Sequence, residues 1–203
     1  MNKLNSRSFA TLRMPRLWRV TSAGMTLRKS MRNLEEKAKK VKLLILDMDG
    51  VMTDGRLTIS DKCEIQRHFH VIDGHGIVCL QQTGVKVAVI TTCSSDVVPF
   101  RMGMLGIEHV YRGQNDKQPA YNELLVKLKL REEETAYLGD DLPDLPLILR
   151  AGLGMTVPAA VPEVKAAADG CTEHEGGRGA VREVCELIMR AQGTFDMILS
   201  KYR

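Results

Sequence analysis

The sequence lacks the patterns that mark zinc-binding, disulfide-linked and membrane-spanning proteins. Its five cysteines include no Cys-x-x-Cys pair and no cluster with histidines, which argues against a structural zinc site or a disulfide framework and favours a reducing cytoplasm. No apolar run is long enough for a signal peptide or a membrane span. Aromatic residues make up only 4% of the 203 residues and hydrophobic residues 44%, which favours one α/β domain with an aliphatic core.

The positive charge is concentrated at the N-terminus. Residues 1–34 contain eight Lys and Arg and no acidic residue, so the rest of the chain carries a net charge of −4 although the whole chain carries +4. We therefore expect a basic, disordered extension over residues 1–34, one domain over residues 35–203, and neither nucleic acid nor a membrane as a partner. The extension has three possible origins: a segment upstream of a true start at Met25 or Met31, a disordered tail, or a segment for targeting or anionic-surface binding.

From Lys42 onward, short apolar runs alternate with segments of helical period, the pattern of a Rossmann-like parallel sheet with helices on both faces. The expected strands are residues 41–46, 85–90, 109–111, 135–138 and 153–156. The expected helices are residues 74–82, 96–105, 117–128, 142–150 and 162–168. A β-hairpin is expected at residues 56–70, and a glycine-containing loop followed by a long helix at residues 174–193.

Two acidic clusters follow strands of this predicted sheet. Asp47 and Asp49 come directly after the first strand, and a second cluster after residues 135–138 consists of Asp140, Asp141 and Asp144. The carboxyl ends of parallel strands meet at one edge, so we expect these carboxylates to lie close together, where they repel unless a cation or a proton separates them. Oxygen ligands without histidine favour a hard cation, Mg²⁺ before Ca²⁺ or Mn²⁺.

Two further strand ends carry groups that suit a phosphate. Thr91 offers a hydroxyl and a backbone N–H after one strand, and Lys117 opens the helix that follows another. Taken singly, a Thr after a strand is commonly a cap and a Lys in a first helical turn commonly faces solvent. A site for phosphoryl transfer is nevertheless favoured by the order in which these motifs occur, each after its own strand. The order is Asp-x-Asp, Thr, Lys and Gly-Asp-Asp-x-x-Asp.

This ordered set resembles the four motifs of the haloacid-dehalogenase-like phosphatase superfamily. The resemblance implies that Asp47 attacks phosphorus as the nucleophile and that Asp49 is the general acid and base. It also implies that Mg²⁺ is held by Asp47, the backbone carbonyl of Asp49, and Asp140. The remaining residues that it implies are Asp141 and Asp144 as outer-shell partners of the metal site, and Thr91 and Lys117 as groups that stabilise the phosphoryl oxygens.

From Val41 to Gln192 the chain resembles one branch of that superfamily, the 3-deoxy-D-manno-octulosonate (KDO) 8-phosphate phosphatases. The matching strings lie at residues 46–51, 53–55, 69–74, 139–142 and 176–183. The resemblance implies a capless domain, a homotetramer in which neighbouring subunits close the active site, and hydrolysis of a sugar-acid phosphate for lipopolysaccharide synthesis. The substrate contacts that it implies are Asp49, His70, Val71, Ile72, Asp73, Gly74, Val78, Arg101, Lys117 and Arg178.

Three positions depart from this family pattern, which usually has arginine where this chain has Ile72, Val78 and Cys93. Since a charge-assisted hydrogen bond contributes roughly 1.5–3 kcal/mol, losing three positive charges could weaken binding of an anionic substrate by several kcal/mol. Chemistry at phosphorus is unaffected by these changes. The substrate therefore stays open between the octulosonate 8-phosphate, which we expect, and a nonulosonate 9-phosphate related to sialic acids.

Several residues have alternative interpretations. The loop at residues 176–179 either caps the following helix or brings Arg178 to an anion in its own or a neighbouring site. His70 and His75 lie near the predicted mouth of the site and are either structural or in contact with substrate, and Cys93 is expected to be a packed small side chain.

Two other classes of protein share some of these features. A response-regulator receiver domain also uses Asp, Thr, Lys and Mg²⁺, but it places its acidic pair on the first strand and its phosphoacceptor on a later one. A non-catalytic oligomerisation module would have no need of the set Asp47, Asp49, Lys117 and Asp140, all of which are present.

Overall fold

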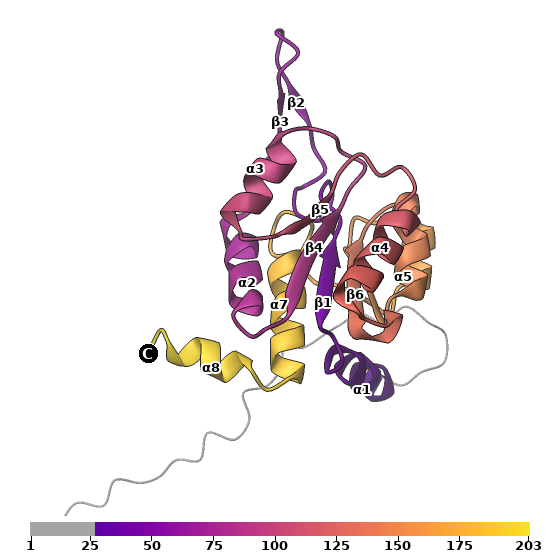
Figure 1. Cartoon of the computed structure of the whole chain (residues 1–203), viewed down its shortest axis with the longest axis vertical. Helices are drawn as coiled ribbons and strands as arrows, with labels where there is room; N and C mark the ends of the chain where they lie inside the picture. The colour runs from indigo at the N-terminus through magenta and orange to yellow at the C-terminus, as the bar shows by residue number, and fades with distance from the viewer. Residues whose placement is uncertain (1–26) are drawn as a thin grey trace, which may run out of the picture.

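The computed structural model describes residues 27–203, and residues 1–26 of the expected basic extension lie outside the described residues (Figure 1). A six-stranded sheet has the order β5-β4-β1-β6-β7-β8, and every neighbouring pair is parallel. The strands are β1 (Leu43–Leu46), β4 (Lys86–Ile90), β5 (His109–Tyr111), β6 (Thr135–Gly139), β7 (Leu153–Thr156) and β8 (Gly170–Cys171). The central strands are buried on both faces, and β1 and residues 87–90 of β4 are accordingly continuous aliphatic runs without alternation. The fully buried β6 also contains Thr135 and Tyr137.

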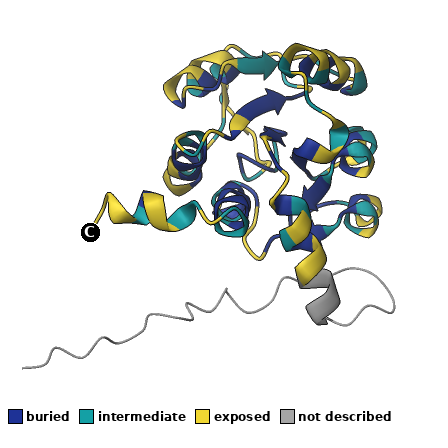
Figure 2. Cartoon of the chain, turned by 60° about the horizontal axis from the view of Figure 1, so that its bottom comes forward, coloured by how far each residue is buried: buried dark blue, intermediate teal, exposed yellow. Residues whose placement is uncertain are grey.

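Helices cover both faces of this sheet (Figure 1). On one face lie α2 (Val71–Gln81), α3 (Val97–Met104) and α7 (Ala180–Ala191), with α1 (Leu27–Ala38) packed against α7. On the other face lie α4 (Gln118–Leu128), α5 (Leu145–Arg150) and α6 (Pro162–Ala167). Figure 2 shows buried strands between helices whose outer faces are exposed, which places the aliphatic core in two layers around the sheet.

A β-hairpin projects from the end of the domain where β1 finishes (Figure 1). Its strands β2 (Thr58–Ile59) and β3 (Ile65–Gln66) pair antiparallel, and an isolated bridge between Thr53 and Phe69 continues the pairing at its base. This agrees with the hairpin expected at residues 56–70. Apolar side chains on the hairpin are exposed at Leu57 (48%), Ile59 (63%) and Ile65 (52%).

Several boundaries of the domain and of its helices differ from those predicted from the sequence. The domain boundary expected between residues 34 and 35 falls inside α1, where Leu34 is buried, so residues 27–34 are helical rather than part of a disordered extension. The helix expected at residues 142–150 is divided into a 3₁₀ turn, η2 (Leu142–Asp144), and α5, each with a proline near its start. A second 3₁₀ turn, η1 (Glu132–Glu134), precedes β6.

Besides α1 and η1, the elements β8 and α8 were not predicted from the sequence. Strand β8 has only two residues and begins with glycine, so no apolar run marks it. Helix α8 (Phe195–Ser200) follows α7 and is mostly exposed, with only Ile198 buried. Within residues 27–203, none of the helices combines the length and the apolar character needed to cross a membrane.

Candidate active site

The two acidic clusters meet at the carboxyl ends of β1 and β6, which are neighbours in the sheet. The Asp47 backbone N–H donates to Leu138 at 3.0 Å, which continues the strand pairing up to the first carboxylate. Gly50 then turns the chain with φ +85°, and a Cβ on it would lie 2.1 Å from Asp140 Oδ2. Only glycine allows this approach, which brings carboxylate oxygens of Asp47, Asp140 and Asp144 within 4.8 Å of one another.

Lys117 joins two of these carboxylates at the centre of the site. Its Nζ lies 2.7 Å from Asp47 Oδ1 and 2.6 Å from Asp144 Oδ1, and the Tyr137 hydroxyl donates to the same Asp144 oxygen at 2.6 Å. Lys117 is 2% exposed. Burial lowers the pKa of Lys117, but the attraction of Asp47 and Asp144 outweighs it and raises the pKa overall, which keeps the ammonium charged.

Both carboxylate oxygens of Asp144 accept hydrogen bonds from other groups of the protein. Besides Lys117 and Tyr137 on Oδ1, its Oδ2 accepts the backbone N–H groups of Asp140 and Asp141 at 2.9 and 3.1 Å. A carboxylate that is occupied on both oxygens suits the role of holding Lys117 and the Asp140 backbone better than that of a direct metal ligand.

Asp47 and Asp140 have the properties of metal ligands. Burial, followed by repulsion from Asp144, raises the pKa of Asp47 to about 7, and burial, followed by repulsion from Asp47, raises the pKa of Asp140 to about 7. Asp140 Oδ1 is also buried without a hydrogen-bond partner among the described residues. A divalent cation would neutralise both carboxylates and satisfy this oxygen, so the residues fit Mg²⁺.

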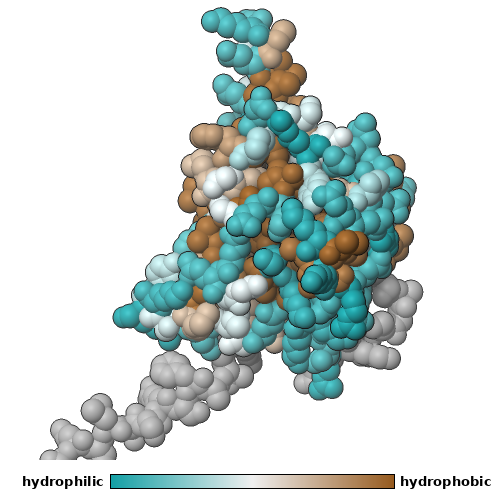
Figure 3. Space-filling view, viewed as in Figure 1, coloured by the Kyte–Doolittle hydropathy of each residue, from teal (hydrophilic) through white to brown (hydrophobic). Residues whose placement is uncertain are grey.

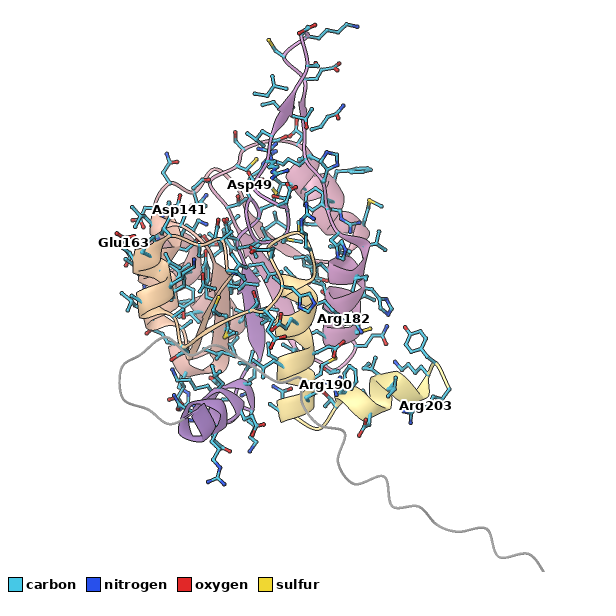
Figure 4. The ribbon with its side chains drawn as sticks, turned by 180° about the vertical axis from the view of Figure 1, so that it is seen from behind. Asp49, Asp141, Glu163, Arg182, Arg190 and Arg203 are labelled. Atoms are coloured by element: carbon cyan, nitrogen blue, oxygen red, sulfur yellow. The ribbon has the colours of Figure 1, made fainter. Side chains whose placement is uncertain are left out.

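Asp49 lies beside this cluster and is held by the base of the hairpin. Arg67 Nε donates to Asp49 Oδ1 at 2.9 Å and is 3.3 Å from Oδ2, and the Thr53 hydroxyl lies 3.4 Å from Oδ1. Figure 4 shows Asp49 at the end of the domain from which the hairpin projects. Arg67 was missed in the sequence because it belongs to no motif and meets Asp49 only through the fold of the hairpin.

Thr91 ends β4 at the same edge of the sheet. It is 1% exposed, and its hydroxyl oxygen accepts the Cys93 backbone N–H at 3.1 Å. Because that bond uses the oxygen as an acceptor, the hydroxyl proton can still be donated to a phosphoryl oxygen. Cys93 is half-buried and packs against the core, as expected.

Asp73 does not face a substrate. It is 2% exposed, and its two carboxylate oxygens accept backbone N–H groups at the start of α7, from Gly179 at 3.1 Å and from Arg182 at 2.8 Å. Burial raises the pKa of Asp73 against the lowering effect of these two bonds. We therefore correct the expected substrate contact: this side chain fastens α7 to α2 and is closed to ligands.

The other expected contacts divide into exposed and packed residues. Val71 (80% exposed) and Ile72 (53%) are accessible at the start of α2, whereas Gly74 is buried and Val78 packs against the core. A Cβ at Gly74 would lie 2.7 Å from Arg101 Nη2, so this glycine makes room for the guanidinium. The buried Gly74 and the packed Val78 are thus placed to shape the site rather than to offer it polar groups.

Arg101 and His70 both keep polar atoms without partners among the described residues. The Arg101 guanidinium lies 5.6 Å from the centre of the Phe69 ring, and its Nε is buried and unpaired. His70 Nδ1 is also buried and unpaired, 3.6 Å from Asp73 Oδ2. His75 lies apart from them, next to Cys79 and Tyr202, and so belongs to the contact between α2 and the C-terminus.

The glycine loop docks directly against the loop that follows Asp47. The Gly177 backbone N–H donates to the Val51 carbonyl at 2.9 Å, and a Cβ at Gly176 would lie 1.7 Å from the Gly50 carbonyl oxygen. The loop thereby places the exposed Arg178 on a cavity of about 500 Å³ that Asp140 also lines. Gly179 at the end of this loop is the N-cap of α7, so the loop caps the helix and leaves Arg178 exposed beside it.

Asp141 was expected to be an outer-shell partner of the metal site, and the structure shows its side chain at the start of η2. It is exposed, and its Oδ1 accepts the Leu142 backbone N–H at 2.8 Å, so the side chain caps η2. Figure 4 shows it at the same end of the domain as Asp49. Asp141 and Asp144 also form a capping box, in which each side chain accepts the backbone N–H of the other residue, so the carboxylate of Asp141 acts as a cap.

Comparison with known proteins agrees with this geometry. Residues 83–184 match the family model of haloacid dehalogenase-like hydrolases, so the fold and the acidic clusters define a hydrolase of that class. The 3-deoxy-D-manno-octulosonate 8-phosphate phosphatase KdsC of Escherichia coli K12 is 44% identical over 160 residues, which cover 79% of this chain and 85% of the relative. The chain belongs to the family of 3-deoxy-D-manno-octulosonate 8-phosphate phosphatases.

Solved structures give the same result. A hydrolase of the same superfamily, subfamily III A, from Legionella pneumophila is 50% identical with a TM-score of 0.84, over 86% of this chain and 96% of that one. The Moraxella catarrhalis 3-deoxy-D-manno-octulosonate 8-phosphate phosphatase, in complex with a magnesium ion, a phosphate ion and a KDO molecule, is 41% identical with a TM-score of 0.83, over 85% and 99% of the two chains.

Proposed function

We propose that this chain hydrolyses 3-deoxy-D-manno-octulosonate 8-phosphate to KDO and phosphate in the cytoplasm, with Mg²⁺ as cofactor, in the synthesis of lipopolysaccharide precursors. The observation that carries the proposal is the contact of Lys117 with both Asp47 and Asp144 beside the unpaired Asp140 oxygen. Family membership over most of the chain supports the choice of substrate.

In the first step, an Asp47 carboxylate oxygen forms a bond to phosphorus while the ester bond to the sugar oxygen breaks. Asp49 donates a proton to that leaving oxygen and becomes a carboxylate. In the second step, Asp49 takes a proton from a water molecule, whose oxygen attacks the aspartyl phosphate and releases phosphate with Asp47 restored. Asp47 thus serves as the nucleophile, and Asp49 serves first as the general acid and then as the general base.

The other residues of the cluster bind the metal ion or donate to the phosphoryl oxygens. Asp47, the Asp49 carbonyl and Asp140 would bind Mg²⁺, which when bound supplies positive charge to the phosphoryl oxygens. Lys117 and the Thr91 hydroxyl donate to the remaining phosphoryl oxygens. Asp144 fixes the position of the Lys117 ammonium through the 2.6 Å contact.

The sugar acid would contact residues around the cavity. The polar contacts that we propose are Asp49, Lys117, His70, Arg101 and Arg178, next to the exposed apolar side chains of Val71 and Ile72. Arg178 lines one cavity with Asp140 and a second cavity with His70 and Ile72.

We further propose that the domain is capless and that four copies assemble so that neighbouring subunits close the active site. Apolar side chains are exposed on the hairpin, at the start of α2 and on α3, where Phe100 is 71% and Met104 64% exposed. Figure 3 shows this apolar surface on the hairpin and beside it. Exposed apolar surface of this extent is typical of contacts between subunits.

The departures at Ile72, Val78 and Cys93 favour a second candidate, a nonulosonate 9-phosphate, because they alter the surroundings of the sugar acid and leave the phosphoryl site unchanged. Steady-state kcat/KM on both esters with saturating Mg²⁺ distinguishes the two. We expect a higher value on the octulosonate 8-phosphate. A clear preference for the nine-carbon ester would refute our choice of substrate, and equal rates for wild type and Asp47→Ala would refute the mechanism.

A further inference from the structure

Arg67 occupies an unusual position for a hairpin residue. It follows β3 on the returning leg of the hairpin, yet its side chain is only 8% exposed because it points inward to Asp49. Thr53, on the outgoing leg, approaches the same carboxylate at 3.4 Å. The two legs therefore hold Asp49 between them, and Arg67 is fixed in place before any substrate arrives.

The guanidinium of Arg67 uses only part of its hydrogen-bonding capacity. Nε alone donates to Asp49, at 2.9 Å from Oδ1 and 3.3 Å from Oδ2. Neither Nη group makes a hydrogen bond or an ion pair to any described residue. Arg67 thus keeps the two parallel donors that bind a carboxylate most strongly.

The location of these free donors follows from the chemistry of Asp49. In the proposed mechanism Asp49 protonates the oxygen that joins phosphorus to the sugar, so the body of the sugar acid extends past Asp49 and away from Asp140. A group attached to Asp49 lies on the sugar side of the site. Arg178 lines one cavity with Asp140 and a second with His70 and Ile72, and Arg67 lines neither of the two.

Arg67 also brings a positive charge to a site in which three arginines of the family pattern are replaced by uncharged residues. Its hydrogen bond to Asp49 raises the pKa of the guanidinium against the lowering effect of burial, which keeps the group charged. Cys93 cannot supply a positive charge, whereas Arg67 brings one to the same region from a different segment of the chain. A substrate that bears both a carboxylate and a phosphate needs a cation beyond Lys117, which is occupied by Asp47 and Asp144.

We propose that Arg67 is a specificity-determining residue that binds the carboxylate of the sugar acid through its two Nη groups while Nε holds Asp49. This inference rests on the proposed function, since it assumes a carboxylate-bearing ester. It makes the hairpin part of the substrate site and accounts for recognition of an acidic sugar despite Ile72, Val78 and Cys93.

Two esters and three variants test this role. We would measure kcat and KM for wild type, Arg67→Gln, Arg67→Lys and Lys62→Gln on the octulosonate 8-phosphate and on glucose 6-phosphate, a primary alkyl phosphate that has no carboxylate. Lys62→Gln is the matched control, because it removes one positive charge from the exposed tip of the same hairpin. Both leaving groups are primary alkoxides that need a proton from Asp49, so an effect that passes through Asp49 is common to both esters. The ratio of the two losses therefore isolates the carboxylate contact.

We expect Arg67→Gln to lower kcat/KM on the sugar-acid ester about 10- to 100-fold more than on glucose 6-phosphate, mainly through KM, as the loss of a charge-assisted contact requires. Arg67→Lys should recover part of this ratio and Lys62→Gln should leave it unchanged. Equal losses on both esters for Arg67→Gln would overturn the role, and if that variant fails to fold, equal losses for Arg67→Lys would do so. A wild type without preference for the sugar-acid ester would instead refute the proposed function.

Discussion

Removing the charge of Asp140 should stabilise the metal-free protein while abolishing its response to Mg²⁺. Burial and the nearby Asp47 raise the pKa of Asp140 from 3.8 to about 7, so the folded protein binds more protons than the unfolded chain between these values. The free energy of unfolding of the metal-free wild type must therefore fall as pH rises from about 4 to 7. Asp140→Asn removes this penalty and also relieves the repulsion on Asp47.

The size of the effect follows from the pKa. A carboxyl group whose pKa is raised from 3.8 to about 7 loses roughly 4 kcal/mol of stability at pH 8. Asp140 is partly exposed and water screens part of this, so we expect about 2 kcal/mol, or a rise in Tm of about 4–8 °C for a domain of this size.

Thermal melts followed by circular dichroism, in EDTA and in MgCl₂ from pH 5 to 8, measure both effects. In EDTA at pH 8 the variant should melt above the wild type, and the difference should shrink toward pH 5. In MgCl₂ the wild type should gain stability and the variant should not. The reasoning is wrong if Asp140→Asn is less stable than wild type in EDTA at pH 8, or if Mg²⁺ stabilises both proteins equally.

Three further predictions concern groups that hold the site together. Lys117→Met leaves Asp47 and Asp144 buried without their counter-charge. The variant should lower the free energy of unfolding, measured in urea with EDTA, by about 3–5 kcal/mol at pH 8 and by less at pH 5. An equal loss at the two pH values would contradict this. Asp73→Ala leaves the start of α7 without its acceptor and should lower stability by about 2 kcal/mol in the same assay, whereas no change would refute the fastening role. Gly176→Ala should lower kcat/KM on p-nitrophenyl phosphate at least tenfold by displacing the Gly50 loop, and wild-type activity would show that the loops are not coupled.

Much of the fold was predictable because its strands are buried on both faces. A strand such as Leu43–Leu46 has no exposed side chain, so its aliphatic run and the turn that follows identify it without knowledge of its neighbours. The order of strand-terminal residues also predicted that Asp47, Lys117 and Asp140 meet, since parallel strands bring their carboxyl ends to one edge. Strand β8 and α8 carry no comparable pattern.

Contacts made across the fold could not be read from the sequence. Asp73 resembled a substrate contact because it lies in a string shared with the family, but its partners Gly179 and Arg182 are more than 100 positions away. Arg67 meets Asp49 only because the hairpin returns to its own base. Asp141 and Asp144 differ by three positions in one cluster, and the direction in which η2 turns determines which of them reaches Lys117.

The most direct test of the phosphatase mechanism is to trap the phosphoryl group on Asp47. A single turnover with the octulosonate 8-phosphate and Mg²⁺, quenched in acid and analysed by mass spectrometry, should show one phosphoryl group on the peptide that contains Asp47. Asp47→Asn should show none and release no phosphate. A phosphoryl group on another residue, or phosphate release by Asp47→Asn at the wild-type rate, would contradict the account.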